Sequence, residues 1–272
     1  MLDSEKRNFV CETGSIVLNF LEYLGNLSIL LMQTISWLIR GLFTRRAKIS
    51  YPALSKQLVR IGIKSLLIVA LVQLFIGAIL ALQIEPVLRQ YGQEKQLASV
   101  IGTAGFRMLG PIFTAVVLSG FAGASIAAEL GTMVVSEEIE AMKAMALNPV
   151  RFLVVPRVAM TTLAMLLLTT FADVMIAVGG YLVGRYALGA NVYHYYWQLM
   201  QRSLKFSDYY SGLTQGFVFG LLIGLIACHE GLSVKDGAAA VGRATTMTVV
   251  YSIVAIVVAA CICTIGFYLF QI

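Results

Sequence analysis

The sequence has few charged residues and very few histidines or cysteines. Asp, Glu, Lys and Arg together make up 12% of its 272 residues, and 59% of the residues are hydrophobic. In a soluble domain about a quarter of the residues are charged. This shortage of charge excludes an ordinary soluble domain, so the composition predicts an integral membrane protein.

Motifs of enzyme chemistry are also missing. The two histidines, His194 and His229, belong to no HExxH array, and the four cysteines are scattered without metal-ligand spacing. There is no Gly-x-Ser-x-Gly elbow, and the Gly-Ile-Lys-Ser fragment at 62–65 lacks the other parts of a P-loop. We therefore expect no enzyme, no catalytic site, no metal and no cofactor in this chain. If ATP is used, another subunit must bind it.

Long apolar runs dominate the sequence instead. Five of them are long enough for a helix to cross about 30 Å of hydrocarbon, and they cover residues 64–84, 108–133, 153–187, 212–230 and 244–270. They lack the alternation of a membrane β-barrel, and backbone groups in lipid must be paired. The sequence thus predicts an all-α integral membrane protein with five transmembrane helices.

A sixth apolar segment, residues 12–39, has a different pattern. Its polar residues would form one narrow stripe on a helix: Glu12, Ser15, Asn19, Glu22, Asn26 and Gln33. The helix could lie in the membrane interface with this stripe toward water or protein, or it could span the membrane with the stripe packed inward. Two carboxylates in a span would be costly, so we favour an interfacial amphipathic helix. We assign it to an N-terminal region 1–50, followed by a five-span domain 51–272.

Basic residues predict the orientation. Seven of them cluster before and at the start of the first span: Arg40, Arg45, Arg46, Lys48, Lys56, Arg60 and Lys64. The positive-inside rule places this cluster, and with it the N-terminus, in the cytoplasm. After five spans the C-terminus, residues 270–272, lies on the far side. The loops 134–152 and 231–243 are then cytoplasmic, and the loops 85–106 and 188–211 external.

The formal net charge of +6 comes mainly from this cluster. We interpret it as a signal for orientation and for contact with anionic lipid. Because no nucleic-acid motif accompanies it, we expect no nucleic-acid partner.

Three ionisable residues lie within or beside the apolar runs, where such residues are candidates for function. Asp173, in the middle of the third run, could join two helices by a hydrogen bond or take part directly in transport. Arg107, at the start of the second run, could hold a phosphate bidentately or anchor the helix at the interface. We expect Glu129 to be a structural partner of a neighbouring polar group.

Small residues are spaced for close contact between helices. Gly216, Gly220 and Gly224 recur every four residues in the fourth run, a spacing that lets another helix approach. Similar residues in the second run are Gly120, Gly123, Ala124, Ala127, Ala128 and Gly131. Contacts within one chain and a homodimer seam both explain this pattern.

A short amphipathic helix is predicted at 136–148, between the second and third runs. Ser136 can cap its start, and Asn148-Pro149 ends it. Its apolar side carries Ile139, Met142, Met145 and Ala146, and its polar groups include Glu137, Glu138, Glu140 and Lys143. Such a helix could lie on the bilayer or insert into a groove of a soluble partner.

Two ordered motif blocks give the chain a family resemblance. The first lies between Arg107 and Arg157 and contains Leu109-Gly110-Pro111, Ala127-Ala128-Glu129-Leu130-Gly131-Thr132-Met133, Glu138-Ile139-Glu140-Ala141-Met142, Asn148-Pro149 and Val154-Val155-Pro156-Arg157. The second is Gly242-Arg243-Ala244-Thr245-Thr246, before the last run. With these motifs the chain resembles the MlaE/YrbE family of lipid ABC-transporter permeases.

The resemblance implies a homodimeric, multi-pass permease of the bacterial inner membrane that moves phospholipid and so acts on lipid asymmetry. The implied partners are a cytoplasmic ABC ATPase dimer, a periplasmic MCE-domain protein and often a STAS-domain protein. The helix at 136–148 would be the coupling helix to the ATPase, with Glu137, Glu138, Ile139, Glu140, Met142, Lys143 and Met145. The lipid cavity would involve Ile79, Gln83, Arg107 and Met108.

The sequence departs from the family pattern at three positions. Met108 replaces a Glu, Phe121 an Arg and Met247 an Arg. Without a Glu at 108, Arg107 is expected to lack its neighbouring acid, which allows a different lipid or another way of holding the headgroup.

Two further functions remain open. A proton-coupled secondary transporter would use Asp173 as its carrier, although no inverted repeat supports it. A membrane scaffold without transport would need only the glycines and the docking helix.

Overall fold

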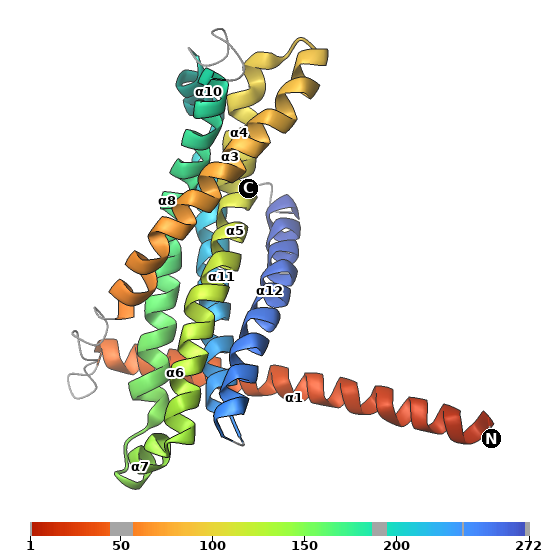
Figure 1. Ribbon diagram of the computed structural model, residues 1–272, viewed down its shortest axis with the longest axis vertical. Coiled ribbons are helices and arrows are strands. Elements are labelled where there is room, and N and C mark those ends of the chain that lie inside the picture. The colour runs from red at the N-terminus through yellow and green to blue at the C-terminus, as the bar shows by residue number, and fades with distance from the viewer. Residues whose placement is uncertain (1, 44–56, 187–194, 236, 270–272) are drawn as a thin grey trace.

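The chain forms an elongated bundle of helices (Figure 1). The computed structural model describes residues 2–43, 57–186, 195–235 and 237–269; apart from short turns these are helical, and no strand occurs among them. Within them, five stretches are long and apolar enough to cross a membrane: Val59–Gln90, Glu94–Val135, Val150–Tyr186, Phe206–Leu232 and Ala238–Leu269. The prediction of an all-α integral membrane fold with five spans is confirmed.

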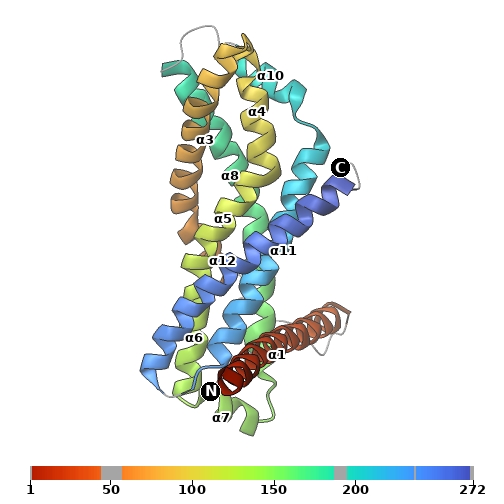
Figure 2. The same cartoon turned by 90° about the vertical axis from the view of Figure 1, so that its right-hand side faces the viewer.

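The first and third spans each begin with a single π turn. η2 (Val59–Ile63) leads into α3 (Lys64–Gln90), and η6 (Val150–Val154) leads into α8 (Val155–Tyr186). The fourth and fifth spans are α11 (Phe206–Leu232) and α12 (Ala238–Leu269). The short helices α7 (Glu138–Ala144) and α10 (Tyr196–Ser203) lie at opposite ends of the bundle (Figure 2). We refer to these as the α7 end and the α10 end.

The second span is interrupted twice by π turns. Its elements are η3 (Glu94–Gln96), α4 (Leu97–Ala104), η4 (Gly105–Leu109), α5 (Gly110–Leu118), η5 (Ser119–Gly123) and α6 (Ala124–Val135). The π turns are η4 and η5. A π turn takes one residue more than an α-helical pattern and is frequent at functional sites. Arg107 lies in the first of these turns and Phe121 in the second.

The external loop predicted at 85–106 is wrong for most of its length. α3 continues to Gln90, and the second span begins at Glu94. This extension is stable because the buried face of α4 packs against α10, and that face carries Leu97, Ala98 and Ile101. A helix end that contacts another helix need not be as apolar as one facing lipid, so a hydropathy count underestimates its length.

The loop predicted at 188–211 is also largely helical where it is described. It contains α10 and the start of α11, while residues 188–194 lie outside the described part. The hydroxyl of Tyr196, which is fully buried, donates a hydrogen bond to the carbonyl oxygen of Ala177 at 3.1 Å. Burial raises the pKa of this phenol above its ordinary value. Tyr196 therefore fixes α10 against α8 as a neutral anchor.

The glycines of the fourth span make contacts within the chain. A Cβ atom added at Gly216 would lie 2.8 Å from Thr169 Oγ1, and one added at Gly224 would lie 3.0 Å from the Cα atom of Val158. Gly220 likewise faces α8. These residues let α8 and α11 approach closely, so intramolecular packing explains the four-residue repeat.

The N-terminal helix α1 (Leu2–Phe43) lies across the bundle near its α7 end instead of running along it (Figure 1). Glu22, Asn26 and Gln33 of the predicted polar stripe are exposed. On another face of α1, Tyr23 packs with ring centroids 4.9 Å from His229 and 5.3 Å from Tyr251. This arrangement agrees with the predicted interfacial helix.

Part of the predicted topology falls outside the described residues. Arg45, Arg46, Lys48, Lys56 and the boundary at residue 50 lie there, as do His194 and the C-terminal residues 270–272. Of the predicted basic cluster, Arg40, Arg60 and Lys64 are described.

Candidate functional site

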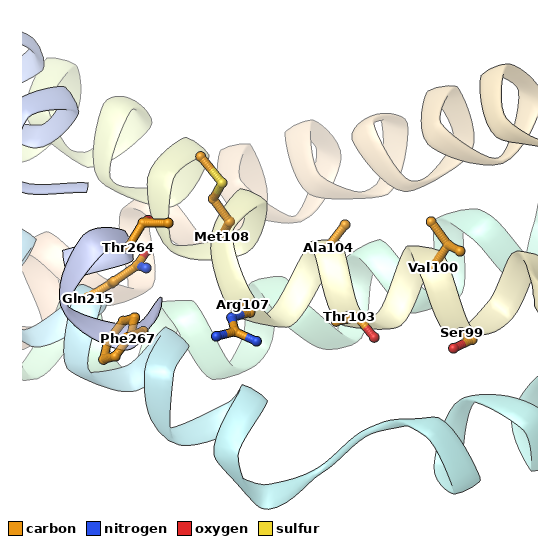
Figure 3. A pocket seen from close by; sticks show the side chains of 9 residues that line it. All are labelled: Ser99, Val100, Thr103, Ala104, Arg107, Met108, Gln215, Thr264 and Phe267. Carbon is orange, nitrogen blue, oxygen red and sulfur yellow. The ribbon is translucent and has the colours of Figure 1, made fainter. Parts of the chain in front are cut away.

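Two adjoining cavities lie toward the α10 end, between the second span and the helices α11 and α12. The first has a volume of about 480 Å³ and is lined by Ser99, Val100, Thr103, Ala104, Arg107, Met108, Gln215, Thr264 and Phe267 (Figure 3). The second, of about 560 Å³, is lined by Thr103, Arg107, Ser203, Lys205, Ser207, Asp208, Phe267 and Tyr268. Thr103, Arg107 and Phe267 belong to both, so the two cavities form one continuous site.

The helix that carries Arg107 presents two different stripes to this site. Figure 3 shows the side chains of Ser99, Thr103 and Arg107 on one side of the helix, and those of Val100, Ala104 and Met108 on the other. Each stripe repeats every four residues, as expected for one face of a helix. The site therefore has a polar and an apolar wall supplied by the same element.

Arg107 is paired with a carboxylate from another helix. Its Nη1 atom lies 3.6 Å from Asp208 Oδ1. Asp208 is nearly buried, and its other oxygen accepts a hydrogen bond from the backbone N–H of Lys205 at 3.1 Å. The expectation that Arg107 lacks an acid is therefore wrong. The carboxylate comes from the first turn of α11 and not from position 108.

Arg107 also lies further from the start of the second span than the sequence indicates. The second span begins at Glu94 and not near residue 108, so Arg107 is about 20 Å along the helix from that end at a rise of 1.5 Å per residue. Its side chain is 39% exposed. Because Arg107 is partly exposed and lines both cavities, its guanidinium is accessible to an anionic group brought into the site.

The predicted cavity residues are only partly brought together. Arg107 and Met108 line the site. Ile79 and Gln83 are exposed on α3 and line neither of the two cavities. The sequence reasoning missed Ser99 and Thr103, although both stand at four-residue spacing before Arg107, because they fell in the predicted loop. It also missed Lys205 and Asp208, for which the chain offers no local signal.

Asp173 is buried between helices. Its side chain is 2% exposed, and a Cβ atom added at Gly110 would collide with Asp173 Oδ1. Beside it, Gln73 donates hydrogen bonds to the carbonyl oxygen of Gly110 at 3.1 Å and to Thr114 Oγ1 at 2.9 Å. Asp173 lines neither cavity around Arg107. Among the described residues its Oδ1 atom has no hydrogen-bond partner, so Asp173 is a buried carboxyl group packed against Gly110 of α5.

Glu129 bridges two arginines near the α7 end. Its Oε2 atom lies 2.9 Å from Arg60 Nη1, and its Oε1 atom lies 3.5 Å from Arg157 Nη2. The side chain of Arg157 is 9% exposed, whereas that of Glu129 is 35% exposed. The carboxylate thus compensates a guanidinium that is almost withdrawn from solvent.

Replacing Glu129 with glutamine is expected to lower the stability of the fold by about 1–3 kcal/mol. The variant keeps the shape of the side chain but leaves the buried Arg157 without the carboxylate, and part of the loss is screened because Glu129 is partly exposed. Thermal unfolding in detergent measures the effect. The control is Glu85→Gln, which removes the ion pair between Glu85 and the exposed Arg89, where Oε1 and Nη1 are 3.9 Å apart. Equal stability of the two variants would contradict the prediction.

The helix predicted at 136–148 is shorter and starts differently. α7 covers Glu138–Ala144, and its N-cap is Glu137, at a positive φ of 61°, and not Ser136. Ile139 is buried against the bundle, whereas Met142 is half-buried and Met145 is 64% exposed. The exposed polar side chains are those of Glu137, Glu138, Glu140 and Lys143. One apolar residue therefore anchors α7, and the others remain on its surface.

The fold is that of an integral membrane protein with five helical spans, and the site between its helices has one polar and one apolar wall. The chain belongs to the MlaE permease family, because the family model described as Permease MlaE matches residues 54–265. It is thus a transporter component.

Individual relatives cover most of the chain. A probable ABC transporter permease protein of Rickettsia typhi is 39% identical over 203 residues, which are 75% of this chain and 78% of the relative. The intermembrane phospholipid transport system permease protein MlaE of Haemophilus influenzae is 31% identical over 248 residues, 90% of this chain and 92% of that protein. The chloroplastic protein trigalactosyldiacylglycerol 1 of Arabidopsis thaliana is 31% identical over 214 residues, 79% of this chain and 61% of that protein.

Proposed function

We propose that the chain is the permease subunit of an ABC-type transporter in the inner membrane that moves phospholipid to or from a periplasmic MCE-domain partner. The observation that carries this proposal is the pair of adjoining cavities that share Arg107. The name of the Haemophilus relative, an intermembrane phospholipid transport system permease, supports the choice of phospholipid.

The two cavities suit the two parts of a phospholipid. Val100, Ala104 and Met108 offer an apolar surface to acyl chains. Arg107 and Lys205 line the polar cavity and would hold the phosphate, the arginine through two parallel hydrogen bonds. Asp208 would keep Arg107 oriented before the lipid arrives. A cation that is already held in place loses less side-chain entropy on binding.

The remaining parts of the transporter are proposed from family membership and from exposed surfaces. A cytoplasmic ATPase dimer would bind ATP, so this subunit would need no cofactor, and α7 would be the coupling helix in a groove of that ATPase. A STAS-domain protein would join the ATPase. A second copy of the chain would cover α12, whose Val254, Val257 and Ile262 are each more than half exposed.

The proposed orientation puts the α7 end in the cytoplasm and the α10 end in the periplasm. α1, which carries Arg40, crosses the bundle near its α7 end, and Arg60 contacts Glu129 of α6, the helix that leads to α7. This agrees with the positive-inside rule. In this orientation the N-terminus is cytoplasmic, the C-terminus is periplasmic, and the Arg107 site faces the side on which an MCE-domain protein would receive or deliver lipid.

The alternative of a proton-coupled transporter has less support. Asp173 would have to exchange its proton with an aqueous path, yet it is 2% exposed and packed against Gly110. A scaffold without transport would give the cavities around Arg107 no role. Both alternatives predict that substitution of Arg107 leaves lipid binding unchanged.

Replacing Arg107 with glutamine is expected to lower the phospholipid that co-purifies with the complex by roughly tenfold, since a hydrogen bond to a charged group contributes about 1.5–3 kcal/mol. The complex is purified in nanodiscs, and its lipids and partner proteins are measured by mass spectrometry. Recovery of an ATPase and an MCE-domain protein with the wild type supports the partner assignment.

Two further variants separate binding from folding. Arg107→Gln combined with Asp208→Asn removes both charges of the pair and is expected to lose lipid to the same extent while avoiding an unpaired buried carboxylate. Lys95→Gln changes an exposed cation that lines neither cavity and is expected to keep wild-type lipid. Unchanged lipid in both Arg107 variants would refute the proposed role.

A further inference from the structure

A third cavity, toward the α7 end, has a strongly basic rim. It has a volume of about 180 Å³ and lies between η2 with the start of α3 on one side and η5 with the start of α6 on the other. Its polar lining is Gln57, Arg60, Lys64 and Ser125, and its apolar lining is Ile61, Phe121, Ala122 and Ile126. It shares no residue with the Arg107 site.

Arg60 is held in a fixed position at this cavity. Its Nη1 atom contacts Glu129 Oε2 at 2.9 Å, and its Nη2 atom donates a hydrogen bond to Ser125 Oγ at 3.1 Å. Because Glu129 also pairs with Arg157, one carboxylate serves two guanidinium groups. The local charge therefore remains positive after both pairs have formed.

Lys64 adds a second cation to the same rim. It stands four residues after Arg60, close to one helical turn further on, and its side chain is exposed. Among the described residues, no carboxylate lies within ion-pair distance of its ammonium group. The cavity thus presents one guanidinium held by two contacts and one exposed ammonium group, a combination that attracts a phosphate group.

The other wall and the position of the cavity indicate an amphiphile. Ile61, Phe121 and Ile126 give it an apolar side, which a free phosphate ion would not use. η2 begins close to the height at which the C-terminal end of α1 meets the bundle (Figure 1), and α1 is the helix that we place in the membrane interface. Two of the lining elements, η2 and η5, are π turns, which are frequent at functional sites.

We propose that this cavity binds the phosphate-bearing headgroup of a phospholipid from the leaflet at the α7 end, as a site separate from the one at Arg107. Arg60 and Lys64 contact the phosphate, while Phe121 and Ile61 contact the glycerol and the first acyl carbons. Basic pockets between membrane helices bind anionic headgroups in this way. The inference does not rest on the transport function proposed above, because it concerns different residues at the other end of the bundle.

Photo-crosslinking tests the proposal. The wild-type complex in nanodiscs is irradiated with a phosphatidylglycerol probe that carries a diazirine in its headgroup, and labelled peptides are mapped by mass spectrometry. We expect label in segments 57–64 and 121–126. Lys64→Gln is expected to lower this label about fivefold, because one basic residue near an anionic leaflet contributes about 1 kcal/mol to binding. Since Lys64 is exposed, the variant is expected to fold normally.

Controls distinguish lipid binding at this cavity from lipid binding at the Arg107 site, and a bound lipid from a bound phosphate ion. Lys64→Gln should leave the label in segment 99–108 unchanged. Lys235 is an exposed cation in the turn between α11 and α12, and Lys235→Gln should change neither the label in segments 57–64 and 121–126 nor the label in segment 99–108. The proposal is overturned if segments 57–64 and 121–126 carry no label, or if Lys64→Gln does not reduce it. Displacement of this label by millimolar inorganic phosphate would show instead that the ligand is the free anion.

Discussion

Replacing Gly179 with alanine is expected to separate α3 from α8 and to destabilise the bundle. A Cβ atom at this position would collide with the carbonyl oxygen of Leu74 and would lie 3.1 Å from the amide nitrogen of Ala78. Both obstacles are backbone atoms of α3, which cannot turn aside as the end of a flexible side chain can. Overpacking of this kind costs about 1–3 kcal/mol, and we expect the upper part of this range.

The same helix offers a matched control. A methyl group added at Gly184, also in α8, would meet no atom within 4 Å. At position 184 the substitution therefore changes only the helix propensity, which favours alanine over glycine by about 1 kcal/mol. Thermal unfolding midpoints in detergent should therefore move in opposite directions, down for Gly179→Ala and unchanged or up for Gly184→Ala. Midpoints that move together would show that α3 and α8 do not approach as closely as the structure has them.

Gly77 provides an independent check from the other helix. A Cβ atom here would collide with the carbonyl group of Ile176 in α8, so Gly77→Ala should lower the midpoint like Gly179→Ala. Combining the two substitutions should cost less than the sum of their separate effects, because helices that have already moved apart accommodate the second methyl group more easily. Close approach at small residues is the main way in which membrane helices associate.

The spans of this fold are predictable from sequence because lipid demands continuous apolar residues along each one. Their ends are less predictable. At Leu97 and Ile101 the helix faces another helix in place of lipid, and glycines such as Gly102 make the segment resemble a loop. Contacts between distant helices therefore set the helix limits that hydropathy misses.

The residues of the candidate site are likewise only partly predictable from the sequence. Arg107 is recognisable because a lone cation beside an apolar run is rare and costly. Its partner Asp208 is not recognisable, because the 3.6 Å contact joins the second span to the first turn of α11, and no periodicity relates two positions so far apart. For Phe121, the sequence shows only a departure from the family pattern, whereas the structure places it in a cavity with Arg60 and Lys64. Met247, the third departure, is exposed on α12.

Changing the exposed face of α7 is expected to uncouple the permease from its ATPase without affecting the fold. Glu140 and Met145 are both exposed, and Ile139 alone among the apolar residues of this segment is buried in the bundle. The double variant Glu140→Lys, Met145→Glu therefore alters the proposed docking surface and leaves the anchor intact. Residues that fill a pocket at the centre of an interface each contribute about 2 kcal/mol, so we expect ATPase binding to weaken about thirtyfold or more.

The measurement is co-purification of the ATPase subunit together with lipid-stimulated ATP hydrolysis of the complex. Lys95→Glu is the matched control, because it also reverses an exposed charge but lies in η3, at the α10 end. A second control, Ile139→Ala, removes the anchor and should lower thermal stability as well as ATPase binding, since truncation of a buried aliphatic side chain costs about 2–5 kcal/mol. Loss of ATPase binding at unchanged stability, seen only in the double variant, is the result that a coupling helix predicts. Normal ATPase recovery and normal hydrolysis in that variant would place the docking surface elsewhere at this end of the bundle.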